Sequence, residues 1–139
     1  MPKKSGFTLV ELLIVITIIA VLAAVGLVSY IAFLKNARDA KRQSDIKFIQ
    51  SALEQYFADQ KHYPPSVKPD ESIAFGGRTY LTKVPSDPLG SPNYSYVGKP
   101  DGCTTCTNYC LFAKIEATNP SDDSGCTPLD PYNYGVAKP

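Results

Sequence analysis

The sequence has almost no net charge and only one histidine. Fourteen Lys and Arg against thirteen Asp and Glu give a formal charge of +1, which argues against nucleic acid as the main partner. The single histidine, His62, precedes Tyr-Pro-Pro and is expected to interact with a helix C-terminus rather than to act as a base. No activated nucleophile, carboxylate pair or phosphate-binding glycine loop is recognisable. The sequence therefore predicts no catalytic residues, no cofactor and no metal site, and the chain is expected not to be an enzyme.

Charge is almost absent from one long stretch near the N-terminus. Between Phe7 and Leu34 the only charged residue is Glu11. About 20 apolar helical residues cross the hydrocarbon core of a membrane, and this stretch supplies them. Lys3 and Lys4 precede it, which favours an N-terminus inside and a C-terminal domain outside. We expect a single-pass protein of the cytoplasmic membrane.

A secretory signal peptide cut near Ala23 or Ala24, or a plain signal anchor, would also explain an apolar stretch. The stretch is longer than the usual signal-peptide core, and it continues in good helix formers instead of turn residues. Glu11 argues against both alternatives, because a carboxylate inside a membrane helix costs roughly 2.5–3.5 kcal/mol. Glu11 therefore needs a partner that lipid does not offer.

Residues 4–12, Lys-Ser-Gly-Phe-Thr-Leu-Val-Glu-Leu, resemble the signature of type IV prepilins. The resemblance implies that residues 1–6 are a leader, which a prepilin peptidase removes between Gly6 and Phe7 before the new amino group of Phe7 is methylated. It also assigns Glu11 to the amino group of Phe7 on a neighbouring subunit. Opposite charges in a low dielectric would offset each other's desolvation cost, although a pair within one chain also fits this spacing.

A mixed-charge helical segment follows the apolar stretch. The alternative of a nucleic-acid patch rests on its basic residues, Lys35, Arg38, Lys41 and Arg42. Asp39 lies among them and Asp45 follows them, without nearby aromatic residues, which favours a solvated or subunit-contacting helix face. The sequence predicts this amphipathic continuation over 35–62.

An apolar stripe at helical spacing comes next, formed by Ile46, Ile49, Leu53, Tyr56 and Phe57. Two consecutive prolines then end the helix near residue 60. Strands are expected at 80–84, 93–97 and 109–116, and 66–77 is expected to be a loop. The predicted fold is α+β, with one long N-terminal helix, membrane-spanning in its first half, packed against a small antiparallel sheet at 63–139.

The C-terminal part resembles the major pseudopilins of type II secretion as well as small bacterial pilins. The resemblance rests on residues 52–56, on His62-Tyr63-Pro64, and on Val84-Pro85 followed by 87–90, Asp-Pro-Leu-Gly. It fades in the cysteine-bearing tail. Pseudopilins commonly carry a calcium loop near the C-terminus, but the acidic residues available there lack a convincing ligand spacing: Asp122, Asp123 and Asp130.

Four cysteines lie within the C-terminal half: Cys103, Cys106, Cys110 and Cys126. In an exported small domain, clustered cysteines predict structural disulfides in a cysteine-rich tail. Three pairings are open, and we favour Cys103–Cys106 with Cys110–Cys126, because Cys110 lies on a predicted strand to which the tail can return. Zinc binding and a thiol–disulfide oxidoreductase are the alternatives; the second would need a reactive Cys103 or Cys106.

Together these observations predict a structural subunit of a type IV pilus or pilus-like filament. The first alternative is a major pseudopilin of a type II secretion system, the second a membrane-anchored thiol–disulfide oxidoreductase, and a minor pilin that captures DNA or a surface is a further one. The expected partners are further copies of the chain, the prepilin peptidase, the pilus assembly machinery of the inner membrane and, before assembly, the membrane itself. After assembly the subunit is expected in an extracellular filament.

Overall fold

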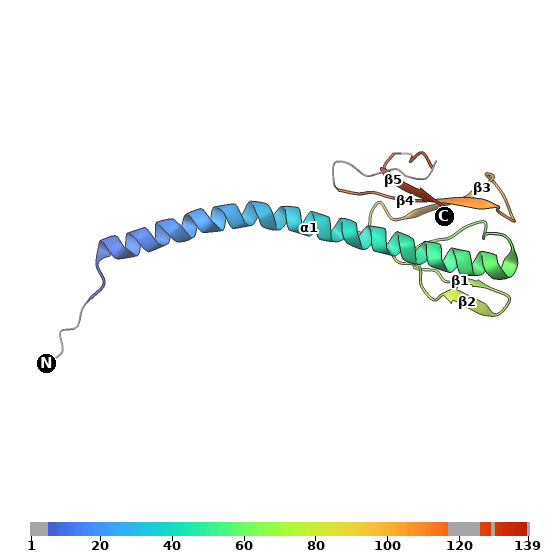
Figure 1. Cartoon of the computed structure of the whole chain (residues 1–139), viewed down its shortest axis with the longest axis horizontal. Helices are drawn as coiled ribbons and strands as arrows, with labels where there is room; N and C mark the ends of the chain where they lie inside the picture. Colours follow the sequence, from blue (N-terminus) through green and yellow to red (C-terminus); the bar gives the residue numbers. More distant parts are fainter. Residues whose placement is uncertain (1–5, 117–125, 129, 139) are drawn as a thin grey trace. The chain divides into compact units, whose positions relative to one another are not determined.

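In the residues that the structure describes, the chain folds into one long helix followed by five short strands (Figure 1). The computed structural model describes residues 6–116, 126–128 and 130–138. The elements are α1 (Leu9–Gln60), β1 (Ile73–Phe75), β2 (Arg78–Leu81), β3 (Ser95–Lys99), β4 (Asn108–Ala113) and β5 (Tyr134–Ala137). This confirms the predicted α+β fold class with a long N-terminal helix and antiparallel strands.

The chain forms two compact units, Met1–Lys35 and Asn36–Pro139. The first contains the apolar part of α1, and the second contains the rest of α1 with all the strands. Helix α1 ends because Lys61 adopts a left-handed conformation, with φ of 61°. The N–H of Lys61 donates to the carbonyl of Phe57 at 2.8 Å, and Pro64 and Pro65 cannot extend the helix further.

The core of the second unit lies between α1 and the strands. The helix contributes a buried stripe with spacings of three and four residues: Ile46, Ile49, Ala52, Leu53 and Tyr56. From the middle strand β4, Tyr109, Leu111 and Ala113 join the same cluster. The alternate residues of β4, Cys110 and Phe112, form a smaller cluster with Cys126. Strand β4 is thus covered on both faces.

The strands form two antiparallel sheets instead of the single sheet that the sequence predicts. One has the order β1-β2 and the other β3-β4-β5, and in Figure 1 they lie on different sides of α1. Strand β1 falls inside 66–77, which the sequence predicts to be a loop, and β5 is not predicted at all. Both are short strands that depend on their ladders with β2 and β4. Local patterning does not reveal such strands, because their partners stabilise them.

Candidate functional site

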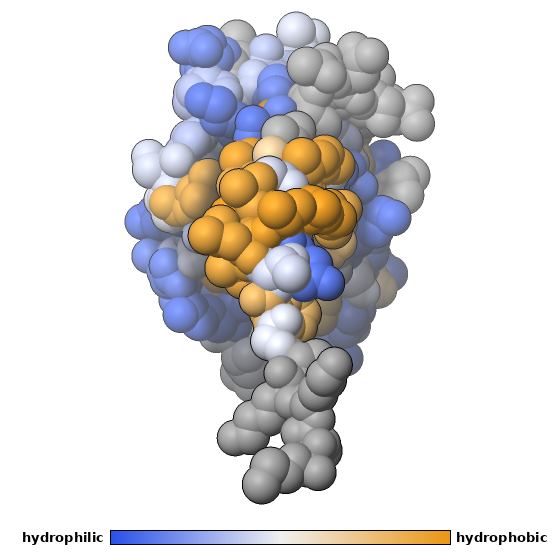
Figure 2. Space-filling model, turned by 90° about the vertical axis from the view of Figure 1, so that its left-hand side faces the viewer, coloured by the Kyte–Doolittle hydropathy of each residue, from blue (hydrophilic) through white to orange (hydrophobic). Residues whose placement is uncertain are grey.

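The first unit exposes a continuous apolar surface. The large hydrophobic side chains that the structure describes between Phe7 and Leu34 are 36–84% exposed, and Figure 2 shows hydrophobic surface, in orange, on this part of the molecule. Helix α1 is long and apolar enough to cross a membrane. Water is a poor solvent for so much apolar area, so this helix requires lipid or other protein around it.

The apolar helix begins with a capping box formed by Thr8 and Glu11. The backbone N–H and the hydroxyl of Thr8 both donate to Oε2 of Glu11 at 2.8 Å. In return, the N–H of Glu11 donates to the Thr8 hydroxyl at 3.2 Å. Two free N–H groups of the first turn are therefore satisfied, and the carboxylate finds hydrogen-bond donors within its own chain. Among the described residues, Oε1 of Glu11 accepts no hydrogen bond.

In the second unit, a buried arginine joins three separate segments. Arg42 is 2% exposed, and its Nε and Nη2 donate to the two carboxylate oxygens of Asp87 at 2.6 and 3.1 Å. Its Nη1 donates to Asp39 at 2.7 Å and to Glu116 at 2.8 Å. The network thereby ties α1 to the loop before β3 and to the chain that follows β4. The pair of hydrogen bonds from one guanidinium to both oxygens of one carboxylate is among the strongest charge-assisted arrangements in proteins.

Glu116 shares its carboxylate between two arginines. Arg38 donates from Nε and Nη2 at 2.7 and 2.6 Å, and Arg42 adds its Nη1. The hydrogen bonds from Arg38, and then those from Arg42, lower the pKa of Glu116 to about 2. Hydrogen bonding to Asp87 raises the pKa of Arg42 above its already high value. The charged form of each group is therefore strongly favoured.

This network corrects one expectation from the sequence. The sequence predicts that the charged residues of 35–45 form a solvated or subunit-contacting face, but Asp39 and Arg42 are buried, at 5% and 2% exposure. Only part of the face, including Lys35 and Lys41, is exposed. The reason is tertiary, because Asp87 and Glu116 reach the helix from 45 and 74 residues away from Arg42 and neutralise its charge.

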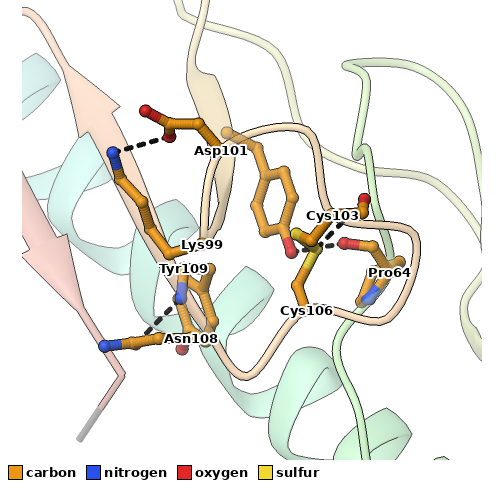
Figure 3. The surroundings of a disulfide bond; sticks show 8 residues. Pro64, Lys99, Asp101, Cys103, Cys106, Asn108 and Tyr109 are labelled. Atoms are coloured by element: carbon orange, nitrogen blue, oxygen red, sulfur yellow. Dashed lines mark hydrogen bonds and ion pairs between the residues drawn. A yellow bond between two sulfur atoms is a disulfide. The ribbon is translucent and has the colours of Figure 1, made fainter.

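One disulfide joins Cys103 to Cys106 in the loop between β3 and β4 (Figure 3). The backbone of Cys106 pairs with Tyr63, with N–H to carbonyl distances of 2.8 and 3.3 Å, and so fixes the chain just after α1. Gly98 lies under the sulfurs, and a Cβ there would be 2.6 Å from Sγ of Cys106. Cys106 is fully buried. The pair does not begin a helix, unlike a thioredoxin-type site.

The second disulfide joins Cys110 of β4 to Cys126 in the tail. Both cysteines are buried against Phe112, on the side of β4 that faces away from the main core. Of the acidic residues considered for calcium, Asp122 and Asp123 lie outside the described residues, and Asp130 is exposed in a turn. No group of three or more His, Cys, Asp and Glu side chains suited to a metal ion occurs in the part of the chain that the structure describes.

Comparison with known proteins finds likeness at two levels. A family model described as the prokaryotic N-terminal methylation motif matches residues 1–27. Type II secretion system core protein G of Aeromonas hydrophila is 32% identical over 103 residues, which are 65% of this chain and 71% of the relative. The chain belongs to the family of type IV pilins and type II secretion pseudopilins. The resemblance that the sequence shows to this family is therefore confirmed.

Other members of the pilin and pseudopilin family give the same result. The core protein G of Escherichia coli (strain K12) is 32% identical over 100 residues, covering 64% of this chain and 69% of the relative. That of Vibrio cholerae is 28% identical over 113 residues, covering 73% and 75%. No solved structure gives a significant match. The family is structural, and membrane anchoring before assembly fits the motif and the apolar helix.

Sequence reasoning predicts a role for Glu11 but misses Thr8, which caps the helix with it, and the charged residues that hold the second unit together. Thr8 could have been found, because Thr-x-x-Glu before an apolar stretch is a capping-box pattern. Asp87 had a weaker signal, since it lies in the Pro-x-Asp-Pro-x-Gly segment that carries the family resemblance. Nothing local marks Glu116 or the burial of Arg42. Their roles depend on contacts between distant segments.

Proposed function

We propose that the chain is a subunit of a pilus-like filament and, within that class, the major pseudopilin of a type II secretion system. The observation that carries this proposal is the extent of the match to proteins named type II secretion system core protein G. That match covers about 100 residues, whereas the methylation motif covers residues 1–27. The likeness therefore reaches well beyond the N-terminal signature that pilins and pseudopilins have in common.

The exposed apolar helix supplies the driving force for assembly. Before assembly it lies in the membrane, with the N-terminus inside and the second unit outside, and in the filament it is buried against the same helix of other copies. Two partners act on this segment. A prepilin peptidase removes residues 1–6 and methylates Phe7, and the assembly machinery of the inner membrane extracts the mature subunit.

Glu11 guides the register of neighbouring subunits. Its Oε2 is occupied by the Thr8 cap, and Oε1 remains able to accept from the new amino group of Phe7 on a neighbour. The capping box thus supplies hydrogen-bond donors to Oε2 in the free subunit, and in the filament a neighbouring subunit supplies a donor to Oε1. Both contacts hold the carboxylate charged in an apolar surrounding, where an unpaired charge is costly.

Replacement of Glu11 tests the filament part of the proposal. Glu11→Ala should leave membrane insertion intact or improved, because a buried charge is removed, but should strongly reduce the yield of filaments. The matched control is Thr17→Ala, which also removes a polar side chain from the apolar helix; the Thr17 hydroxyl only donates to the carbonyl of Ile14 at 2.7 Å. Normal filament yield from Glu11→Ala would contradict the role of the carboxylate.

A type IV pilus subunit is the second candidate, because the methylation motif does not distinguish the two filaments. Deletion of the chain's gene in its source bacterium separates them. Loss of protein export to the medium with surface pili retained supports the pseudopilin. Loss of surface pili with export retained supports the pilus subunit and overturns the secretion assignment.

A further inference from the structure

The hairpin formed by β1 and β2 is a two-stranded sheet, so in the described residues each strand has one unpaired edge. Strand β1 pairs only with β2 in the part of the chain that the structure describes. Phe75 and Arg78 flank a two-residue turn in which Gly76 and Gly77 have φ of 59° and 83°, as a type I′ turn requires. Phe75 and Arg78 are then a hydrogen-bonded pair, and the next pair along the ladder is not hydrogen-bonded.

This alternation sets the direction of the backbone groups of Ala74. Ala74 is paired with Thr79, next to the closing pair, so its N–H and C=O point away from β2. Ala74 is exposed, and no hydrogen bond to these two groups is found among the described residues. A short strand edge with a free donor and acceptor recognises another extended backbone.

The free edge borders a cavity of about 400 Å³, a size within the range of ligand-binding pockets. Residues 72–75, which include β1, and residues 64–68, which follow the end of α1, both line it. Pro64 and Pro65 have no N–H, so at these two positions this part of the lining cannot donate a backbone hydrogen bond to β1. It is also fixed in place, because the hydroxyl of Tyr96 donates to the carbonyl of Pro64 at 2.6 Å.

Three aromatic rings line the same cavity: Tyr56, His62 and Phe75. Their centroids are 5.7 to 6.3 Å apart, and Phe75 is 52% exposed although it contacts the other two rings. The charged side chains of the lining, Lys68 and Glu71, pair with each other at 3.8 Å. The cavity therefore presents an aromatic surface without net charge, which suits an uncharged segment with a large apolar side chain.

We propose that the free edge of β1 and this cavity bind an extended, uncharged segment of a partner protein by strand addition. Backbone hydrogen bonds to Ala74 supply the pairing, and an aromatic or large aliphatic side chain of the segment packs on Phe75 and its neighbouring rings. All residues of the site belong to the second unit, and none of them lies in the apolar segment Phe7–Leu34. The inference goes beyond the proposed function and does not rest on it.

The experiment uses the full mature chain, labelled with ¹⁵N in detergent micelles, and the synthetic peptide Ac-Thr-Val-Thr-Phe-Thr-Val-Thr-NH₂. Hydrogen exchange of single amides is measured by NMR. With peptide at about ten times its dissociation constant, exchange of the Ala74 N–H should slow about tenfold. The Thr79 N–H points outward from the other edge of the hairpin, along β2. Its exchange rate should not change, and it serves as the internal control.

Two matched changes test whether the backbone carries the binding. Ala74→Pro removes the outward N–H without removing a hydrogen bond between β1 and β2, and it should abolish peptide binding, whereas Thr79→Pro should retain it. If Ala74→Pro does not fold, as judged by near-ultraviolet circular dichroism, the peptide methylated on alternate backbone nitrogens replaces it and should not bind. Phe75→Ser should weaken binding of the unmodified peptide.

Four outcomes of the peptide experiments would overturn the proposal. These are no saturable binding up to about 1 mM peptide, equal binding by Ala74→Pro, equal binding of the N-methylated peptide, and unchanged exchange at Ala74. Protection of Ala74 that rises with protein concentration in the absence of peptide would also overturn it, in favour of pairing between two copies of the chain. Filament yield of Phe75→Ser should equal that of the wild type, which separates this proposal from the proposed function.

Discussion

At the residue scale, Arg42 is the charged group with most influence on the second unit. It brings together Asp87, Asp39 and Glu116, and its side chain is 3% exposed. A buried arginine with incomplete partners is strongly destabilising, whereas the complete network mainly specifies one arrangement of the segments it joins. The fork to Asp87 also fixes the loop itself, because the N–H of Leu89 donates back to Asp87 at 2.8 Å.

Removal of the Asp87 carboxylate should therefore destabilise the fold far more than removal of an exposed partner. We expect Asp87→Ala to lower the free energy of unfolding by about 3–5 kcal/mol, because it leaves Arg42 buried with an unmet charge. The control is Asp101→Ala, whose partner Lys99 lies at 2.7 Å but in an exposed pair, with a cost of about 0–1 kcal/mol. Urea unfolding followed by near-ultraviolet circular dichroism measures both, and equal costs would contradict the prediction.

Glu116 should make the second unit sensitive to acid. Its folded pKa, about 2, is below its usual value of 4.5, so protons bind more tightly to the unfolded chain. The stabilisation is then fully present above about pH 4.5 and is lost as the pH falls toward about 2. We expect the difference in unfolding free energy between wild type and Glu116→Gln to shrink across this window. A difference that stays constant from pH 6 to about pH 2 would disprove the role of this carboxylate.

At the scale of elements, the two disulfides close loops of different length. Cys103–Cys106 joins residues three apart, and Cys110–Cys126 joins residues sixteen apart. The shorter bridge contains Cys106, whose backbone pairs with Tyr63 just after α1, and the longer one holds Cys126 against the outer face of β4. Both lie in the C-terminal half, as the fold predicted from the sequence requires.

Loop length predicts which bridge stabilises the fold more. A disulfide stabilises the fold by lowering the chain entropy of the unfolded state, and a longer closed loop gives a larger effect. We therefore expect removal of Cys110–Cys126 to lower the free energy of unfolding by about 3 kcal/mol and removal of Cys103–Cys106 by about 2 kcal/mol. Paired Cys→Ala variants are compared by urea unfolding, with thiol counting to verify that the other bridge is intact. A larger loss from the shorter bridge would show that its contact with Tyr63, and not chain entropy, dominates.

At the scale of the whole molecule, the two units differ in where their apolar side chains lie. The unit Met1–Lys35 is apolar and exposed, whereas Asn36–Pro139 has its own buried core. Maturation should remove only the leader and keep the apolar helix on the subunit. Intact-mass and N-terminal peptide analysis of the mature protein should therefore show a methylated Phe7 as the first residue. A chain that begins near Ala24 would indicate ordinary signal-peptide cleavage and would contradict the filament proposal.

Several features of this protein follow from the sequence by itself. The apolar stretch with its single carboxylate and the prolines after residue 60 are local signals, because membrane length and helix breakers depend on neighbouring residues. The periodic stripe from Ile46 to Tyr56 likewise predicts a helix with one buried face. These signals were sufficient for the fold class and the family.

Only the tertiary structure decided the rest, because it depends on residues far apart in the chain. In the sequence, Asp39 and Arg42 look like surface charges. They can be buried only because the fold brings Asp87 and Glu116 to them and completes the network of ion pairs. Strand β1 is too short to be recognised by its own pattern and exists through its ladder with β2. The free edge that this strand presents to the cavity is therefore a property of the folded chain and of no single segment.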